Sequence, residues 1–96
     1  MPSTKEYKDY VLDQLKQINN ITYRSMMGEF LLYKDGVLFG GIYDDRLLIK
    51  ITKNNKKYNM EEQVPYPGAK PMYLVNDIDN SIALNKIIEI TYDDLK

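Results

Sequence analysis

The sequence predicts an α+β fold: an antiparallel sheet of about five strands, with helices at the N-terminus, in the middle and at the C-terminus. Strand-like segments of β-branched and aromatic residues are grouped between residues 21 and 51. Short turns separate them, and Asp35-Gly36 supplies the positive φ that a tight hairpin needs. Apolar residues recur at helical spacing near both ends. Strands joined by hairpins, with helices outside the group, indicate this class and not parallel βαβ units.

The first helix is expected from Thr4 to Ile18. Ser3 at the N-cap and Glu6 three residues later fit a capping box. Asn19-Asn20 is expected to end the helix, because asparagine tolerates the left-handed conformation of a helix exit. The residues expected on its apolar face are Tyr7, Tyr10, Val11, Gln14, Leu15 and Ile18.

Four strands are expected next. The first is Ile21–Ser25, and the Asp35-Gly36 turn pairs Glu29–Tyr33 with Val37–Tyr43. A corner at Asp44-Asp45 leads into Arg46–Ile51. The strand after Gly36 is apolar on both faces, so we expect it to lie in the middle of the sheet. One face of this strand would carry Val37, Phe39, Gly41 and Tyr43. The other face would carry Leu38, Gly40 and Ile42.

Gly40-Gly41 interrupts the expected central strand. Glycine weakens a strand unless another group comes close to the backbone or a bulge forms there. We interpret the pair as a place where a helix packs tightly. A ligand that approaches the backbone at Gly40-Gly41, in an enzyme or a small-molecule binder, is the alternative.

The second half of the chain is more irregular. Thr52 is expected to cap a short polar surface helix from Lys53 to Glu62, although its asparagines are poor helix formers. The proline-rich segment Val64–Pro71 is expected to be a loop or an edge strand, because proline has no amide donor. Met72–Val75 is the last expected strand.

The final helix is expected from Ser81 to Tyr92, with Asp79 or Asn80 as its cap. Asp93 and the residues after it are expected to trail off from the helix. Its apolar face would comprise Ile82, Ala83, Ile87 and Ile90, widened by Leu84 and Ile88.

The composition excludes several classes of function. Ninety-six residues suffice for one domain, residues 1–96. The absence of cysteine and histidine removes thiolate nucleophiles, the usual general base and imidazole metal ligands. The net charge of −1 does not indicate nucleic acid. No apolar run approaches the ~20 residues of a membrane span, and the N-terminus is too polar for a signal peptide. We therefore expect a cytoplasmic, non-enzymatic protein without cofactor, metal or membrane contact.

The order of motifs resembles a known family. The chain resembles the start of the N-terminal domain of TfoX/Sxy, the bacterial regulators of competence genes, in two consecutive segments, Tyr10–Leu15 and Ile21–Gly28. The family has an opening helix, a strand ending in Arg-x-Met-Phe-Gly-Gly, a hairpin of the form Leu-Tyr-x-Asp-Gly-x-x-Phe-Gly, and a strand ending in Leu-x-x-Lys. Leu32–Gly40 matches the hairpin and Leu47–Lys50 the last strand. The resemblance covers nearly the whole chain and is densest from Tyr10 to Lys50.

The chain also departs from the family pattern. Met27 stands where phenylalanine is usual, and Glu29 stands where a second glycine is common. The late strand is reduced to Met72–Val75, and we do not expect these 96 residues to contain the second, helical domain of the long family members. The residue pattern predicts the element order α-β-β-β-β-α-β-α. The resemblance implies a stand-alone regulatory module, with no catalytic residues to carry over.

Two groups of side chains are candidates for a protein-binding surface. Arg24, Met26 and Met27 lie where the first strand turns into the hairpin, and methionine-rich surfaces suit adaptable recognition. In the alternative interpretation the methionines fill gaps in the core, and Arg24 pairs with a carboxylate. Tyr66 and Tyr73 flank the proline-rich loop, where we expect them to be exposed.

Lys50, Lys53, Lys56 and Lys57, here called the lysine patch, form the one concentrated basic segment. No acidic residue falls between Arg46 and Glu61, and nearby asparagines and a tyrosine offer hydrogen bonds and stacking. A phosphate-binding surface would have such groups. A solvated helix face, or a surface for an acidic protein partner, accounts for the same lysines.

Acidic clusters are given structural interpretations. Asp77–Ser81 faintly resembles a calcium loop, but Ile82 and Ile88 stand where glycine and glutamate are needed, so helix capping is preferred. Asp44 and Asp45 form a carboxylate pair of the kind used in acid–base chemistry, but adjacent acids in a turn usually face water.

The leading hypothesis is a protein-binding module, with a homodimer as one arrangement. Nucleic-acid binding through Lys50–Lys57 is the second hypothesis.

Overall fold

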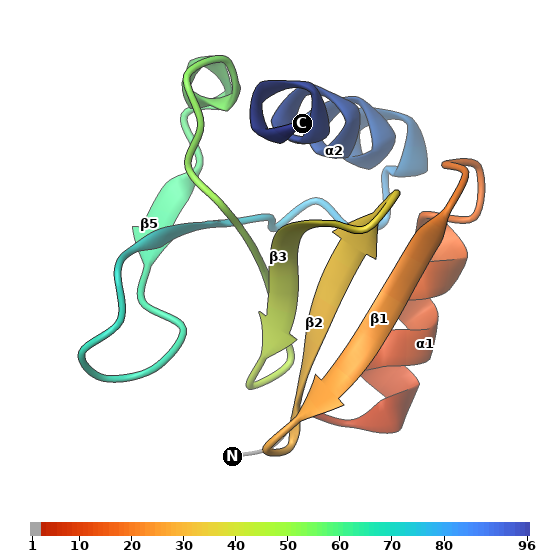
Figure 1. The fold of residues 1–96 in the computed structure, drawn as a ribbon, viewed down its shortest axis with the longest axis vertical. Coiled ribbons are helices and arrows are strands. Elements are labelled where there is room, and N and C mark those ends of the chain that lie inside the picture. The colour runs from red at the N-terminus through yellow and green to blue at the C-terminus, as the bar shows by residue number, and fades with distance from the viewer. Residues whose placement is uncertain (1–2) are drawn as a thin grey trace.

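The computed structural model describes residues 3–96 and confirms the α+β class. An antiparallel sheet has the strand order β1-β2-β3-β4-β6-β5 (Figure 1). Its strands are β1 (Ile21–Met26), β2 (Glu29–Lys34), β3 (Val37–Tyr43), β4 (Arg46–Ile49), β5 (Glu61–Gln63) and β6 (Met72–Leu74). The helices are α1 (Lys5–Gln14) and α2 (Ser81–Leu95), and η1 (Asn55–Tyr58) is a short 3₁₀ helix. The sheet therefore has one strand more than the five expected.

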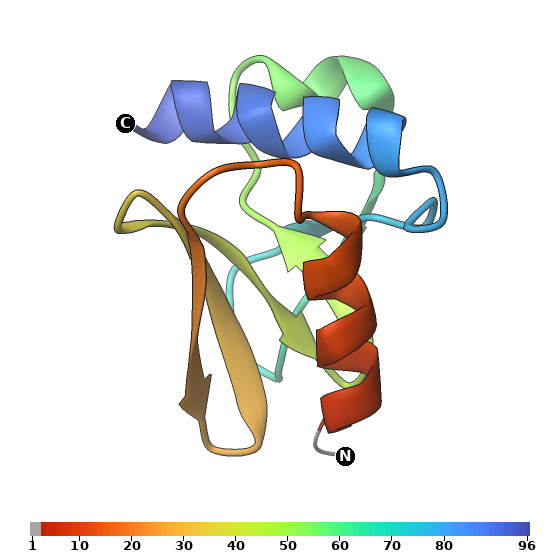
Figure 2. The same ribbon diagram turned by 90° about the vertical axis from the view of Figure 1, so that its right-hand side faces the viewer.

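The two α-helices lie on the same side of the sheet. Figure 2 shows α1 along the sheet and α2 across its upper end. Four residues are fully buried against apolar residues of the strands: Val11 of α1, the α1 C-cap Leu15, and Leu84 and Ile88 of α2. Those strand residues are Leu32, Phe39, Ile42, Leu47, Ile49 and Tyr73. We call this side the covered face, and the opposite side, seen in Figure 1, the open face.

Three two-residue turns connect β1 to β4. The central residues of these turns are Met27-Gly28, Asp35-Gly36 and Asp44-Asp45. In each turn, both of them have a positive φ. This is the type I′ geometry, whose twist matches that of the flanking strands. Aspartate tolerates the left-handed region well enough to form the third turn without glycine. The Asp45 carboxylate also accepts hydrogen bonds from the amide (2.8 Å) and hydroxyl (3.2 Å) of Thr4, so it anchors the start of α1 and does not only face water.

A register shift changes the expected faces of β3. Leu32 pairs with Gly40 but Tyr33 pairs with Leu38, which leaves Phe39 as an extra residue. Such a bulge turns its side chain toward the same face as its neighbour. Phe39 therefore joins Leu32 in the core, and the prediction that it shares a face with Gly41 and Tyr43 is wrong.

The glycines of β3 are required by neighbouring strands and by a ring. A Cβ on Gly40 would lie 2.3 Å from the backbone oxygen of Leu48, and one on Gly41 would lie 2.8 Å from the Tyr43 ring. Both distances are too short for van der Waals contact, so the positions demand glycine. Close packing is confirmed, but the expected helix does not make it. Strand β4 packs against Gly40, and the Phe30 carbonyl of β2, 2.7 Å from a Cβ on Gly41, and the Tyr43 ring pack against Gly41.

The first helix is shorter than expected. Thr4, not Ser3, is its N-cap and accepts a hydrogen bond from the Tyr7 amide at 3.1 Å. Ser3 instead donates to the Glu29 carboxylate at 2.8 Å, which couples the chain start to β2. Lys8 is buried with its ammonium group 4.4 Å from the centre of the Tyr23 ring. The hydrogen bond to Asp9 raises the pKa of Lys8, so this buried amine keeps its charge.

The final helix confirms Asn80 as the cap, since its side-chain oxygen accepts a hydrogen bond from the Ala83 amide at 3.2 Å. It runs to Leu95 and not to Tyr92, so Asp93 and Asp94 belong to the helix. Ile82 was expected on the apolar face but is 72% exposed. Leu84, Ile88 and Thr91 are the residues that α2 buries.

The expected middle helix from Lys53 to Glu62 is wrong. Only the 3₁₀ helix η1 forms, and Glu61–Gln63 pairs with β6 as an edge strand. Asn55 explains the short η1, because it is fully buried and its side chain accepts a hydrogen bond from the Thr52 amide (2.9 Å). It also donates to the Lys50 carbonyl and the Thr91 hydroxyl, both at 2.9 Å. A local side-chain bond of this kind competes with helix formation.

Candidate binding face of the sheet

Strand β1 forms one border of the sheet and is the most exposed strand. Five of its six residues are exposed. It pairs with β2 on one side only, so its other side presents unpaired backbone groups. Tyr23 faces α1, and therefore Arg24 and Met26, which alternate with it, project to the open face.

Arg24, Met26 and Met27 lie together at the end of this strand. Met26 is 46% exposed and Met27 is 96% exposed, so the interpretation of these methionines as core fillers is wrong. Arg24 is also exposed, and no carboxylate within residues 3–96 lies within 4 Å of its guanidinium group. The predicted pairing of Arg24 with a carboxylate is therefore not formed in this part of the chain.

The proline-rich loop, residues 64–71, brings Tyr66 to the same region. Tyr66 is 58% exposed, and its ring centre lies 6.4 Å from that of Tyr43. Tyr66 and Met27 line one shallow hollow of about 440 Å³. We call Arg24, Met26, Met27 and Tyr66 the edge surface. Tyr73 does not belong to it, because it is only 7% exposed and packs in the core, contrary to our expectation.

Arg46 holds the proline-rich loop against the sheet. Its guanidinium group donates to the side chain of Gln63 at 2.7 Å and to the carbonyls of Val64 and Pro65 at 3.4 Å. The Arg46 Nε also donates to the Tyr43 carbonyl at 3.1 Å. One side chain of β4 thus fixes the position of the loop that carries Tyr66.

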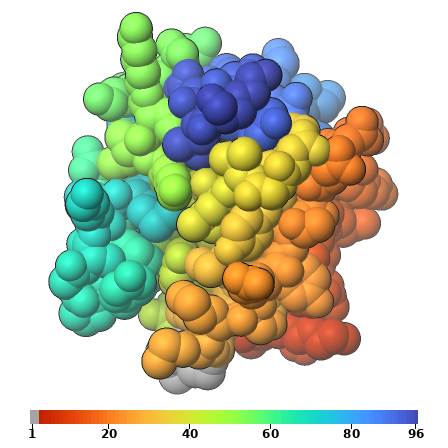
Figure 3. All heavy atoms as spheres, in the orientation of Figure 1, coloured from red at the N-terminus to blue at the C-terminus, as the bar shows by residue number. Residues whose placement is uncertain are grey.

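A groove of about 620 Å³ lies between this loop and the open face. Figure 3 shows the loop on one side of this face and the β2–β3 hairpin on the other. The residues that line the groove are Leu38, Gly40, Tyr43, Lys50, Ile51, Pro65, Tyr66, Ala69, Lys70, Pro71 and Met72. Burial raises the pKa of Tyr43, which therefore keeps its phenolic proton. Gly40 lines the groove, but sequence reasoning missed Lys70, because a lysine in a loop gives no signal until the loop is placed.

The lysine patch is only partly assembled as expected. Lys53, Lys56 and Lys57 are exposed around η1, whereas Lys50 turns into the groove. Asn55 was expected to offer hydrogen bonds at the surface, but it is buried. The Asp94 carboxylate lies at 2.8 Å from the Asn54 amide, so an acid from α2 enters a segment that is free of acids in the sequence. The Thr52 hydroxyl and then the Asn54 amide lower the pKa of Asp94, which keeps its negative charge beside Lys53.

The acidic loop Asp77–Ser81 serves as a helix cap. Asn80 caps α2, and the Tyr10 hydroxyl donates a hydrogen bond to the Asp79 carboxylate. No group of three or more acidic side chains in residues 3–96 is arranged to hold a metal ion. Across the same residues, neither helix has the length and apolar character needed to cross a membrane.

Comparison with known proteins places the chain in a family. The model of the TfoX N-terminal domain matches residues 13–80. This match includes the whole sheet, the edge surface and the groove, and leaves most of α1 and all of α2 outside. An uncharacterized 12.7 kDa protein from the region 5′ of trpE in Spirochaeta aurantia is 32% identical over 80 residues, which is 81% of this chain and 70% of that protein.

Proposed function

The chain belongs to the TfoX N-terminal domain family, and from this premise we propose that it is a non-enzymatic regulatory module that binds a partner protein through the edge surface. The proposal extends the family assignment in two respects, the absence of catalysis and the use of protein contacts. We also propose that the protein acts in the cytoplasm.

The observation that carries the proposal is the exposure of large apolar side chains along one border of the open face. Met26, Met27 and Tyr66 come from two distant segments, and Met27 and Tyr66 line one hollow. Methionine and tyrosine are enriched in protein interfaces, and a contiguous exposed apolar patch is typical of a binding site. The free border of β1 offers backbone hydrogen bonds to an extended segment of a partner.

Site-specific photocrosslinking tests this proposal. A photoreactive amino acid is placed at Met27 and, as a matched control, at Ile82, which is also exposed but lies on α2. We expect a discrete crosslinked protein from position 27 in cells of the native organism, and none from position 82. Equal crosslinking from both positions would contradict the edge surface as the interface. Crosslinking to a second copy of the chain would identify a homodimer, which sedimentation of the purified protein checks.

Direct nucleic-acid binding through the lysine patch is the alternative. Lys53, Lys56 and Lys57 are exposed, and within residues 3–96 their ammonium groups have no carboxylate within 4 Å. The buried Asn55 and the charge of Asp94 disfavour this alternative, since they reduce the polar donors and the positive potential there.

Fluorescence anisotropy with labelled duplex and single-stranded DNA separates the two functions. If the lysine patch binds phosphates, affinity falls steeply with salt. A plot of log affinity against log salt concentration should then have a slope of about −3, which corresponds to about three phosphate contacts. The K53E/K56E/K57E variant should then lose binding, whereas K5E/K16E/K86E, with the same net charge, should retain most of it. An absence of binding even at low salt would rule out this alternative and leave the edge surface.

A further inference from the structure

The groove beside the edge surface has the size and lining of a small-molecule site. Its volume of about 620 Å³ lies within the range of roughly 300–1,000 Å³ that is typical of ligand pockets. Leu38, Ile51 and Met72 make its wall apolar, and among the lining residues that the structure describes only Lys50 and Lys70 are charged. No acidic side chain of the described chain takes part in this lining.

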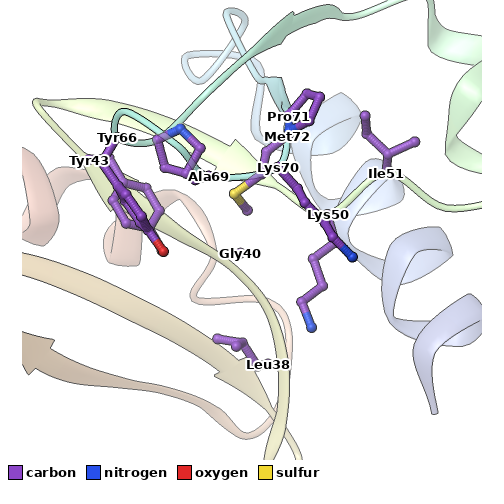
Figure 4. Close-up of a pocket in the computed structure, with 11 residues that line it drawn as sticks. Leu38, Gly40, Tyr43, Lys50, Ile51, Tyr66, Ala69, Lys70, Pro71 and Met72 are labelled. Carbon is purple, nitrogen blue, oxygen red and sulfur yellow. The ribbon is translucent and has the colours of Figure 1, made fainter.

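The two lysines lie apart from the two tyrosine rings in the groove (Figure 4). Figure 4 shows the side chains of Lys50 and Lys70 at one end and the rings of Tyr43 and Tyr66 at the other. Among residues 3–96, no carboxylate lies within 4 Å of either ammonium group. Two lysines that have no carboxylate partner in the described part of the chain, in a largely apolar groove, favour a ligand that combines an anionic group with an apolar body.

The groove is also held open by the chain itself. Pro65, Pro67 and Pro71 restrict the backbone of the loop, and Arg46 bonds to the chain at Gln63, Val64 and Pro65. A loop that is already fixed loses little conformational freedom when a ligand binds, and this saves part of the free energy of binding. Sites of this kind bind small molecules without a large rearrangement.

We propose that the groove binds a small organic anion with a flat apolar body. The body would lie on Leu38 and Met72 near the Tyr43 ring, and the acid group would meet the ammonium groups of Lys50 and Lys70. This inference goes beyond the proposed protein contacts. The groove shares Tyr66 with the edge surface, but Lys50 and Lys70, which would hold the acid group, line the groove and do not belong to the edge surface.

Two fluorescent probes test the inference on the purified full chain. 1-Anilinonaphthalene-8-sulfonate has an aromatic body and a negative charge, and N-phenyl-1-naphthylamine has nearly the same body without the charge. We expect saturable binding of one sulfonate probe per chain. The K50Q/K70Q variant should bind it about tenfold more weakly, as two partly exposed ion pairs would give. The same variant should bind the neutral probe with less than about a twofold change.

Two controls keep the result specific to the groove. K16Q/K86Q removes two exposed lysines from other parts of the surface and should bind both probes as the wild type does. Amide chemical-shift changes on addition of the sulfonate probe should centre on Gly40, Lys50 and Ile51. Shifts centred on Met27, an equal affinity for K50Q/K70Q and wild type, or no saturable binding would each overturn the inference. An unchanged circular dichroism spectrum and Tm show that each variant is folded.

Discussion

The covered face and the open face share the same strands but are completed in different ways. On the covered face, α1 and α2 pack against the buried apolar side chains of the central strands, which include Leu32, Phe39 and Ile42. On the open face, a short loop covers part of the sheet and leaves a groove and the exposed end of β1. The covered face therefore supplies the stability of the fold, and the open face remains available for recognition. Adjacent residues of one strand can be used to test this division.

The largest effect is expected from Leu32 and Leu31, which are neighbours in β2 and face opposite sides. Leu32 is fully buried in the core, whereas Leu31 is half-buried on the open face. L32A should lower the free energy of unfolding by about 2–5 kcal/mol, because it leaves a cavity. L31A should lower it by about 1 kcal/mol or less. Urea denaturation monitored by circular dichroism measures both values, and equal losses would contradict the division of the two faces.

A smaller effect is expected from Asn55, which ties η1 to α2 on the covered side. N55A would leave the Thr52 amide and the Lys50 carbonyl without their buried partner, at a cost of about 1–3 kcal/mol. The matched change N54A removes one hydrogen bond, from the exposed Asn54 side chain to the Asp94 carboxylate, and should cost less than about 1 kcal/mol. If N54A is the more destabilising variant in thermal unfolding, the buried bonds of Asn55 are not what holds η1.

The smallest effect concerns pH and Asp35, which joins the β2–β3 turn to α2. Its carboxylate accepts hydrogen bonds from Asn20 (2.5 Å), Lys34 (3.3 Å) and Tyr92 (3.2 Å), and these lower its pKa below the ordinary 3.8. The folded chain thus binds this proton more weakly than the unfolded chain. The resulting stability is present above about pH 4 and is lost as the pH falls through the lower folded pKa.

D35N should therefore lower Tm near pH 6, and its curve should converge with that of the wild type below about pH 4. Asparagine suits a type I′ turn, so the change isolates the charge. Differential scanning calorimetry across this pH range measures the difference. D77N, in an exposed loop, is the control and should leave Tm unchanged at every pH. A constant gap between D35N and the wild type would show that the effect of Asp35 is not electrostatic.

The sequence predicted the parts of the fold that short-range chemistry determines. The turn residues Asp35-Gly36 and Asp44-Asp45 located the hairpins, and Asn80 located the start of α2. Each signal depends on one or two residues and their own backbone preferences. The bulge at Phe39 was not predictable in the same way, because it depends on the register between β2 and β3.

The candidate site was predictable only in part, because loop packing creates it. Met27 and Tyr66 were both proposed from residue type, but only the folded loop shows that they line one hollow. Tyr73 has the same residue type and is buried, since β6 lies inside the sheet and not at its border. Lys70 became a candidate only because the folded loop places it in the lining of the groove together with Lys50. Asn55 and Lys8 are the opposite case. Both are polar, so the sequence suggests exposure, but contacts with distant parts of the chain bury them.

The three tight turns have a consequence for how the molecule folds. They place β1 to β4 beside their neighbours in the sequence, so each pairing closes a short loop and loses little chain entropy. Such local pairing lowers the contact order and speeds folding. In contrast, β6 reaches β4 only after a connection of more than twenty residues, and α2 is the last element of the chain. We expect residues 21–49 to form the folding nucleus, with high φ-values there and low ones at Leu84 and Ile88. During synthesis, α1 emerges before this nucleus, and only the part of the nucleus that α2 covers would stay exposed until residues 81–95 emerge.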